Sequence, residues 1–198
     1  AKELGVAHFV IETTRLGDEN IAKNPPDRCY HCKKAAFSKI LELAAQKGYR
    51  TVMDGTNADD AKEHRPGKKA LGELSVLSPL ALVGLTKAEI RLASRRMGLS
   101  TWDRQAQTCF ATRFPYGTNM TKAEISRVAA AEDEIRRLGF SNLRVRCHGD
   151  IARLELPAVE LLAAVGEKRE LISTILKRNG FKYSTIDLDG YRFGSMDE

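Results

Sequence analysis

The alternation of helical and extended patterns in the first half of this sequence constrains its fold more than any other feature. The segment KKAAFSKILELAAQKG (33–48) has helical periodicity and ends at a glycine, and YRTVMDG (49–55) follows it as a short strand. A short helix after Pro66, the extended apolar stretch SVLSPLALVGL (75–85) and a capped helix TKAEIRLASRRMG (86–98) continue the pattern. Helices and strands that alternate along a chain predict a parallel sheet, and therefore an α/β domain.

The second half has a different order of elements. A helix with a capping box, TKAEISRVAAAEDEIRRLG (121–139), precedes two strands, NLRVRCHG (142–149) and DIARLEL (150–156), which a tight turn joins. A helix over 157–179 and a last strand, FKYSTIDLDGYRFG (181–194), complete this half. The order helix–strand–strand–helix–strand predicts a small α+β domain.

We therefore expect two domains, an N-terminal domain with a partial parallel sheet over 1–117 and an α+β domain over 118–198. The chain opens with AKELG, which is typical of the tail of a helix stopped by Gly5, and a strand is expected over 6–12. Because a fold rarely begins with the tail of a helix, we expect an N-terminal segment to be missing from this sequence.

The composition excludes several classes of protein. Hydrophobic residues make up 42% of the chain and charged residues 29%, which is ordinary for a globular protein. The chain has neither an apolar run of about 18 residues nor a signal peptide, so we expect no membrane span and a cytoplasmic location. The net charge of +6 favours anionic partners, but the basic residues are scattered, so we do not expect a nucleic-acid partner.

Four cysteines are too few for a disulfide framework in a chain of this length, so their chemistry has to come from their positions. Cys29 and Cys32 form a Cys-X-X-Cys motif in NPPDRCYHCKK, which we expect to lie in a turn just before a helix. This motif can be half of a zinc site, a redox pair, two ligands of an iron–sulfur cluster, or two unliganded thiols. Cys109, in an aperiodic loop, is the candidate third ligand, whereas Cys147 alternates with Val145 along a strand and is expected to be a small buried hydrophobe.

A second candidate site is the sequence MDGTNADD, in which Asp54, Gly55, Thr56 and Asn57 follow a predicted strand. Ligands of open α/β sheets bind at the carboxyl ends of strands, so this loop is a candidate nucleotide edge. By itself it is equally a capped turn, because Asp, Gly and Asn are turn formers.

A third candidate site is a pair of arginines in the predicted hairpin. Arg144 and Arg146 share one face of their strand, and His148 follows in phase. Two adjacent guanidinium groups can bind phosphate or carboxylate. Glu155 in the next strand and Glu132 in the preceding helix leave open the alternative of a solvated sheet face with cross-strand ion pairs.

Five segments taken together resemble a known family: NPPDRCYHCKK, DGTNADDAKEHRPG, TCFATRFPYGT, LRVRCHGDIARLEL and LDGYRFGSMDE. They are similar to the LarE-type sulfur transferases of the PP-loop ATP-pyrophosphatase superfamily, whose fold is of the adenine nucleotide alpha hydrolase type. The resemblance implies an enzyme that uses ATP and Mg²⁺ to adenylate a carboxylate of a pyridinium dicarboxylate mononucleotide. Sulfur then replaces AMP to give a thiocarboxylate for the nickel-pincer cofactor of lactate racemase. Family members carry an S-G-G-x-D-S loop, which this sequence lacks, so we expect the fragment alone to be inactive.

The resemblance also implies roles for individual residues and a homo-oligomeric assembly. The sulfur source would be a [4Fe–4S] cluster held by Cys29, Cys32 and Cys109, and the nucleotide would be flanked by Asp54, Gly55, Thr56 and Asn57. Substrate phosphate or carboxylate would be bound by Arg113, Arg144 and Arg146. A metal or substrate site would be lined by Glu132 and Glu155. Cys109 and Arg113 would be the catalytic residues. Some family members instead sacrifice one cysteine of the loop before RFPYG as the sulfur donor, which leaves the choice between a sacrificial and a cluster-based sulfur source open.

Two alternative functions remain open. A PP-loop enzyme that thiolates tRNA also uses a Cys-X-X-Cys motif with a third cysteine, but this chain lacks a dense basic stripe for RNA. A non-catalytic domain stabilised by zinc on the same motif would hold one Zn²⁺ tightly and unfold on chelation.

Overall fold

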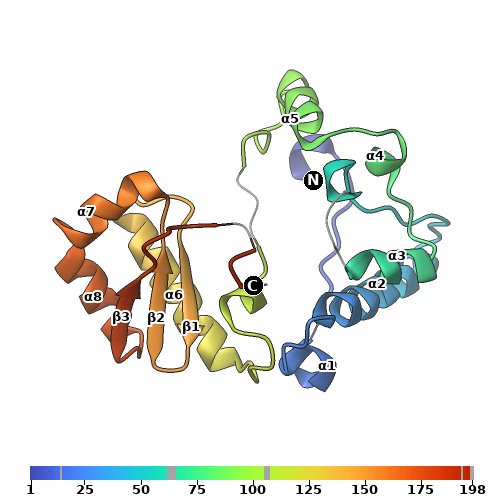
Figure 1. The fold of residues 1–198 in the computed structure, drawn as a ribbon. Coiled ribbons are helices and arrows are strands. Elements are labelled where there is room, and N and C mark those ends of the chain that lie inside the picture. Colours follow the sequence, from blue (N-terminus) through green and yellow to red (C-terminus); the bar gives the residue numbers. More distant parts are fainter. Residues whose placement is uncertain (14, 62–65, 105–107, 193, 197–198) are drawn as a thin grey trace. The chain divides into compact units, whose positions relative to one another are not determined.

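The computed structural model describes residues 1–198 except residue 14, residues 62–65, residues 105–107, residue 193 and residues 197–198 (Figure 1). The described residues form eight α-helices and one three-stranded sheet, which agrees with a mixed α/β class. Contacts divide the chain into unit 1 (Ala1–Ile21 and Pro26–Ala106) and unit 2 (Ala22–Pro25 and Gln107–Glu198). The predicted division between residues 117 and 118 stays a prediction. No helix within the described residues is long and apolar enough to cross a bilayer.

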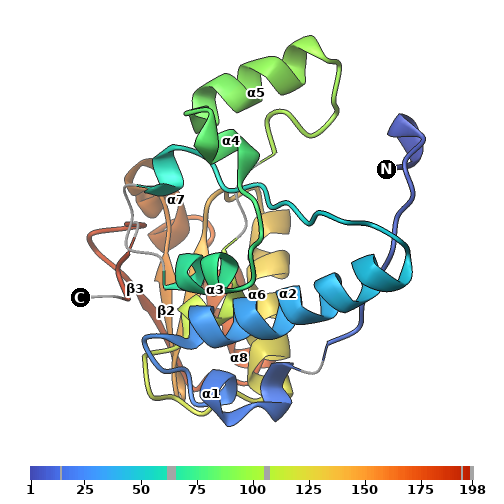
Figure 2. The ribbon, with the colours of Figure 1, turned by 90° about the vertical axis from the view of Figure 1, so that its right-hand side faces the viewer.

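Unit 1 is mainly helical. Its helices are α2 (Arg28–Gln46), α3 (Gly67–Glu73), α4 (Pro79–Leu82) and α5 (Lys87–Arg96), with α1 (Glu19–Ala22) at the boundary and the 3-10 turns η1 (Lys2–Leu4), η2 (Arg15–Gly17) and η3 (Asp59–Ala61). The predicted helix over 86–98 is confirmed as α5, including its capping box between Thr86 and Glu89. Helices α2 and α3 pack against each other (Figure 2). Gly67 permits this close approach, because a Cβ there would lie 3.0 Å from Lys33 Cδ.

The described residues of unit 1 do not form the full parallel sheet that the sequence predicted. Its only strand pairing there is one isolated parallel bridge between Met53 and Leu77, and residues 6–12 are extended but unpaired. A strand needs a partner for its backbone N–H and C=O groups, and the apolar side chains of this segment stay in solvent, with Val10 80% exposed. The extended stretch 75–85 is interrupted by α4, whose first residue is Pro79.

The Cys-X-X-Cys motif lies inside a helix, whereas the sequence predicted a turn before one. Helix α2 begins at Arg28, five residues earlier than expected. Pro25 and Pro26 precede this start, and no glycine or proline follows them before Gln46. Nothing in this segment interrupts the helical pattern, so the helix extends back to within two residues of Pro26.

Unit 2 contains the sheet. Its elements are η4 (Phe110–Arg113), α6 (Lys122–Arg137), β1 (Arg144–His148), β2 (Ile151–Glu155), η5 (Ala158–Glu160), α7 (Leu161–Val165), α8 (Arg169–Arg178) and β3 (Tyr183–Ile186). Strand β2 is central, antiparallel to β1 and parallel to β3. The predicted hairpin and the capping box between Thr121 and Glu124 are confirmed.

The core of unit 2 lies on one face of this sheet. Helices α6 and α8 cover that face and contact each other (Figures 1 and 2). The buried apolar residues include Val128, Ala131, Ile135, Val145, Leu154, Ile172, Leu176 and Phe181. Cys147 is only 2% exposed on the same face as Val145, which confirms it as a buried hydrophobe. The opposite face is thereby left to the charged residues of β1 and β2.

Two predictions for the end of the chain are wrong in extent. The helix expected over 157–179 is divided at Gly166, whose ψ of −104° is not helical. A Cβ added at this position would lie 3.0 Å from the Leu162 carbonyl oxygen. The last strand ends at Ile186 instead of residue 194. Strand β2 ends at Glu155, two residues before Pro157, so β3 has no partner beyond that point.

Candidate functional site

Arg113 anchors the loop that carries Cys109. Its side chain is 3% exposed, and Nη1 donates to the hydroxyls of Thr108 at 2.7 Å and Thr112 at 3.0 Å and to the Cys109 carbonyl at 3.3 Å. Nε and Nη2 donate to the two carboxylate oxygens of Glu132 at 2.7 and 3.0 Å. Because these bonds engage all three guanidinium nitrogens, Arg113 holds this loop in place. Its contact with substrate phosphate stays a prediction.

Glu132 is the buried counter-ion of this anchor. It is fully buried on α6 and also accepts hydrogen bonds from Arg136 Nη2 at 2.8 Å and from the Val145 backbone N–H at 3.0 Å. A buried carboxylate is tolerated only when donors of this kind surround it. The described contacts make Glu132 the link between α6, β1 and the Cys109 loop, and its predicted place at a metal or substrate site is untested.

Three arginines and one glutamate share the face of the sheet opposite the core. The register places Arg144 opposite Glu155 and Arg146 opposite Arg153. Glu155 is fully buried and accepts from Arg146 Nη2 at 2.7 Å and from Arg153 Nη2 at 3.2 Å. The cross-strand ion pair that the sequence left open therefore exists for Arg146, whereas Arg153 pairs with Glu155 along its own strand. We call this set of three arginines the arginine face.

Arg144 differs from the other two members of the arginine face. It is 7% exposed, and its contacts are a hydrogen bond from Nη1 to the Leu143 carbonyl at 2.7 Å and the ring of Tyr191, 5.0 Å from the guanidinium carbon. No carboxylate lies within ion-pair distance of it among the described residues. Burial, and then the nearby charge of Arg113, lowers the pKa of this guanidinium below its ordinary value. A buried cation of this kind is stabilised when an anion binds beside it.

His148 lies on the same face of the sheet as the three arginines, and its lowered pKa predicts that the stability of the protein depends on pH. Burial, and then the charges of Arg153 and Arg146, lowers its pKa, while Glu155 opposes the shift. The unfolded chain therefore binds more protons than the folded protein below about pH 6.5, and the stability present above that pH is lost as pH falls. We expect His148→Gln to lose less free energy of unfolding than the wild type between pH 7 and 5 in urea titrations. Equal losses in the two proteins would contradict this assignment.

Cys29 and Cys32 lie in the first turns of α2, three residues apart and therefore on neighbouring positions of one helix face. Neither cysteine forms a disulfide, and Arg15 Nη1 lies 3.3 Å from the Cys32 sulfur. The arrangement places two thiols close together with a cationic side chain beside one of them.

A polar clamp fixes the start of α2 to α3. The Tyr30 hydroxyl donates to Glu73 at 2.7 Å, and Lys34 Nζ bonds the same carboxylate oxygen at 2.7 Å. Hydrogen bonds with Glu73 and then with Tyr30 raise the pKa of Lys34 above its ordinary value. Because Tyr30 lies between the two cysteines, the clamp orients the turn that carries them.

The three proposed cluster ligands divide between the units: Cys29 and Cys32 belong to unit 1 and Cys109 to unit 2. Cys109 is an exposed free thiol at the start of η4. Within either unit, the described His, Cys, Asp and Glu side chains form no group of three that could hold a metal. All three sulfur atoms are chemically suited to iron, and the cluster itself stays a prediction.

Asp54 organises the DGTN loop of unit 1. Its carboxylate accepts from the Ser78 hydroxyl at 2.6 Å, from the Thr56 hydroxyl and from the Thr56 backbone N–H at 3.2 Å, with Lys33 Nζ at 3.4 Å. Burial alone would raise the pKa of Asp54, but these hydrogen bonds and Lys33 outweigh it and lower the pKa. Asn57 caps the following turn through the N–H groups of residues 59 and 60. The Asp54 carboxylate thus holds the predicted loop together through hydrogen bonds.

A cavity of about 370 Å³ adjoins this loop in unit 1. Thr56, Ser78 and Lys68 supply its polar lining, and Leu71 and Leu77 are among its apolar walls. A cavity of this volume, lined by both apolar and hydroxyl-bearing residues, can hold a small molecule.

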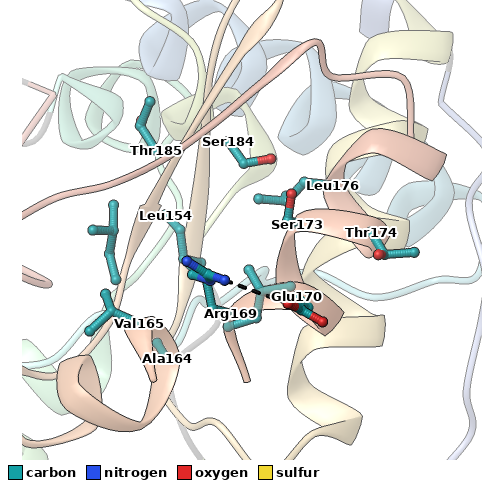
Figure 3. Close-up of a pocket in the computed structure, with 12 residues that line it drawn as sticks. Leu154, Ala164, Val165, Arg169, Glu170, Ser173, Thr174, Leu176, Ser184 and Thr185 are labelled. Atoms are coloured by element: carbon teal, nitrogen blue, oxygen red, sulfur yellow. Dashed lines mark hydrogen bonds and ion pairs between the residues drawn. The ribbon is translucent and has the colours of Figure 1, made fainter. Parts of the chain in front are cut away.

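The larger groove of unit 2 holds none of the predicted residues. It has a volume of about 600 Å³ between α7, α8 and β3 (Figure 3). Leu154 and Ser184 line it, and the register places both on the face of the sheet away from Arg153. None of the three arginines of the arginine face lines this groove.

Sequence reasoning missed Asn24. It is fully buried at a φ of 50° and donates through Nδ2 to the carbonyls of Phe114 at 3.0 Å and Pro115 at 2.9 Å. Its own carbonyl accepts from the Gly117 N–H at 3.0 Å. Asn24 therefore holds the RFPYG turn, and the available signal was an asparagine, a residue that tolerates left-handed backbone, directly before two prolines.

Comparisons with known proteins identify relatives over the whole chain. An uncharacterised protein of Synechocystis sp. is 39% identical over 199 residues, which span all of this chain and 74% of the relative. The pyridinium-3,5-bisthiocarboxylic acid mononucleotide synthase of Lactiplantibacillus plantarum is 37% identical over 201 residues, which span all of this chain and 71% of that enzyme. No family model matches the chain. The identity to the synthase and its coverage show that this chain belongs to the LarE family of pyridinium-3,5-bisthiocarboxylic acid mononucleotide synthases.

Proposed function

We propose that this protein is an ATP-dependent sulfur transferase that converts a carboxylate of a pyridinium dicarboxylate mononucleotide into a thiocarboxylate. The Lactiplantibacillus relative is by name the synthase of the bisthiocarboxylic acid mononucleotide, which supports both the substrate class and the transfer of sulfur. We further propose a PP-loop type of ATP site, a homo-oligomeric assembly and a role in making the nickel-pincer cofactor of lactate racemase.

The proposed reaction has two steps. A substrate carboxylate oxygen attacks the α-phosphorus of ATP, pyrophosphate leaves with Mg²⁺ as its counter-ion, and an acyl-adenylate forms. Sulfur then attacks the acyl carbon, and AMP leaves with the oxygen that ATP activated. The first step is needed because a free carboxylate is a poor electrophile.

The observation that carries the binding part of this proposal is the buried guanidinium of Arg144, which has no carboxylate partner among the described residues. A mononucleotide with a phosphate and two carboxylates supplies the missing negative charge. Arg146 lies on the same face and reinforces the positive potential there, although its own carboxylate partner is Glu155.

The remaining roles follow from the geometry of each unit. We propose that Asp54, Gly55, Thr56 and Asn57 border the nucleotide at the cavity of unit 1. Arg113 and Glu132 position the Cys109 loop, and Glu155 holds the arginine face. Cys29, Cys32 and Cys109 would hold a [4Fe–4S] cluster, and an iron without a cysteine ligand would carry the sulfide for transfer.

We expect Arg144→Ala to weaken binding of the substrate mononucleotide by the value of a charge-assisted hydrogen bond, about 1.5–3 kcal/mol, or roughly 10- to 150-fold in Kd. Isothermal titration calorimetry measures this change. Arg178→Ala is the matched control, because Arg178 is an exposed arginine of the same unit that pairs with Glu134. An unchanged Kd for Arg144→Ala would place Arg144 outside the substrate site.

A further inference from the structure

Three side chains near the end of the chain each contact a different member of the arginine face. The Tyr191 ring lies on Arg144, the Ser195 hydroxyl bonds Arg146 Nη2 at 2.9 Å, and the Met196 sulfur lies 3.3 Å from Arg153 Nη2. Sequence analysis assigned no role to any of the three. Their contacts differ in kind, and the difference decides which arginine can bind an anion.

The contacts of Ser195 and Met196 occupy N–H groups. Arg146 also donates from Nη1 to the Thr112 carbonyl at 2.6 Å and from Nη2 to Glu155 at 2.7 Å, and Ser195 itself donates to Glu155 at 2.7 Å. Arg146 keeps only Nε without a partner among the described residues, and that atom is enclosed. Arg153 is in the same position, because its Nη groups face Glu155, Asp187 and Met196 while its enclosed Nε is unpartnered.

Tyr191 contacts its arginine through its ring and forms no hydrogen bond with it in the described structure. A ring contact of this kind uses no hydrogen-bond acceptor, so it does not compete with an oxyanion for the N–H groups of the guanidinium. Only Nη1 of Arg144 has a hydrogen-bond acceptor among the described residues, the Leu143 carbonyl. The other two nitrogens are not among the enclosed unpartnered atoms, unlike Nε of Arg146 and Arg153.

The backbone fixes Tyr191 in this position. Its N–H donates to the Leu156 carbonyl at 2.8 Å. Gly190, at a φ of +72°, precedes it, and a Cβ there would lie 2.6 Å from that same carbonyl oxygen. Glycine is therefore required for the chain to approach the end of β2 so closely, and the ring is directed by that approach.

We propose that Tyr191 is a positioning residue that presents the N–H edge of Arg144 to an oxyanion of the substrate. This inference rests on the proposed function, because it takes Arg144 as the binding arginine. Ser195 and Met196 hold the other two guanidinium groups in internal bonds, so the residues after β3 select Arg144 as the arginine offered to the ligand.

The test is titration of the protein with inorganic phosphate by calorimetry, using three substitutions. We expect Tyr191→Leu to raise the Kd about 5- to 30-fold, which corresponds to the 1–2 kcal/mol of a desolvated cation–π contact. Tyr191→Phe keeps the ring and should stay within about twofold of the wild type. Tyr183→Leu is the control, since Tyr183 is 63% exposed on β3, and it should leave the Kd unchanged.

The outcomes separate this inference from the proposed function. If Arg144→Ala weakens phosphate binding but Tyr191→Leu does not, the positioning role is wrong and the proposed binding arginine stands. If Arg144→Ala itself has no effect, the proposed function loses its binding site. A Tyr191→Phe variant as weak as Tyr191→Leu would also overturn the inference, because the hydroxyl and not the ring would then act. Should Tyr191→Leu fail to fold, Tyr191→Trp keeps an aromatic face, and its Kd must stay near the wild-type value.

Discussion

Replacing Glu132 with alanine is expected to lower the free energy of unfolding by about 3–5 kcal/mol, because it leaves the buried Arg113 guanidinium without its counter-ion. The change also removes the acceptor for Arg136 and for the Val145 N–H. Urea denaturation followed by far-ultraviolet circular dichroism measures the loss. Asp133→Ala is the matched control: Asp133 is an exposed carboxylate on the same helix that pairs with Arg136, and its loss should cost less than about 1 kcal/mol.

The same pair of residues controls the loop that carries Cys109. In Glu132→Gln the side chain keeps its size but loses its charge, so Arg113 holds Thr108 and the Cys109 carbonyl less firmly. We expect faster amide hydrogen exchange in residues 108–113 of this variant than in Asp133→Ala. A stability loss for Glu132→Ala no larger than that of the control would show that the ion pair is dispensable.

Replacing Cys109 with alanine is expected to prevent assembly of the iron–sulfur cluster without changing the stability of the protein. Anaerobic reconstitution of the wild type should give about four iron and four sulfide per chain, as a [4Fe–4S] cluster requires, and Cys109→Ala should lose most of both. Because Cys109 is exposed, we expect the free energy of unfolding to stay within about 0.5 kcal/mol of the wild type. Iron analysis, labile-sulfide analysis and urea denaturation check the three parts.

Cys147→Ala is the control for this experiment. Cys147 is buried in the core of unit 2, and burial raises the pKa of its thiol despite a hydrogen bond from Arg127. This variant should keep its iron and lose about 1 kcal/mol of stability. A wild-type protein without iron and sulfide after reconstitution would rule out the cluster. Cys109 would then be tested as a sacrificial sulfur donor, by the loss of one H₂S from the mass of the protein after one turnover.

The elements that depend on local interactions were predictable from the sequence. Both capping boxes form as their Thr-X-X-Glu spacing indicates, because the side chain and the N–H groups it bonds lie within one turn. The hairpin over 144–155 forms because a positive-φ glycine, Gly149, closes the turn between two alternating segments. Period-two alternation also placed Arg144 and Arg146 on one face and Cys147 on the other.

The predictions that failed concern extent and partners. Residues 6–12 have the composition of a strand, yet no second strand is beside them in the described structure. The start of α2 was misjudged because nothing after Pro26 interrupts the helical pattern, and the break was missed because Gly166 stops a helix that its neighbours would continue. The full pattern of a sheet depends on pairing that no single segment contains.

The candidate site could be predicted only in part from the sequence. By itself the sequence determined its residue types and their spacing, namely three cysteines, the DGTN loop and the two arginines of β1. It also determined that the two arginines share one face of the sheet. Only the tertiary structure decided which of these charges are paired. Arg113 lies 19 residues from Glu132, and Arg144 lies 47 residues from Tyr191, so no local pattern connects them. Burial makes these pairings necessary. A guanidinium that is removed from water is stable only with a partner, which can be a carboxylate, a carbonyl, an aromatic face or a ligand. Arg113 and Arg146 have carboxylate partners, whereas Arg144 has a carbonyl and an aromatic ring and no carboxylate among the described residues, which is why we propose it as the arginine that binds the ligand.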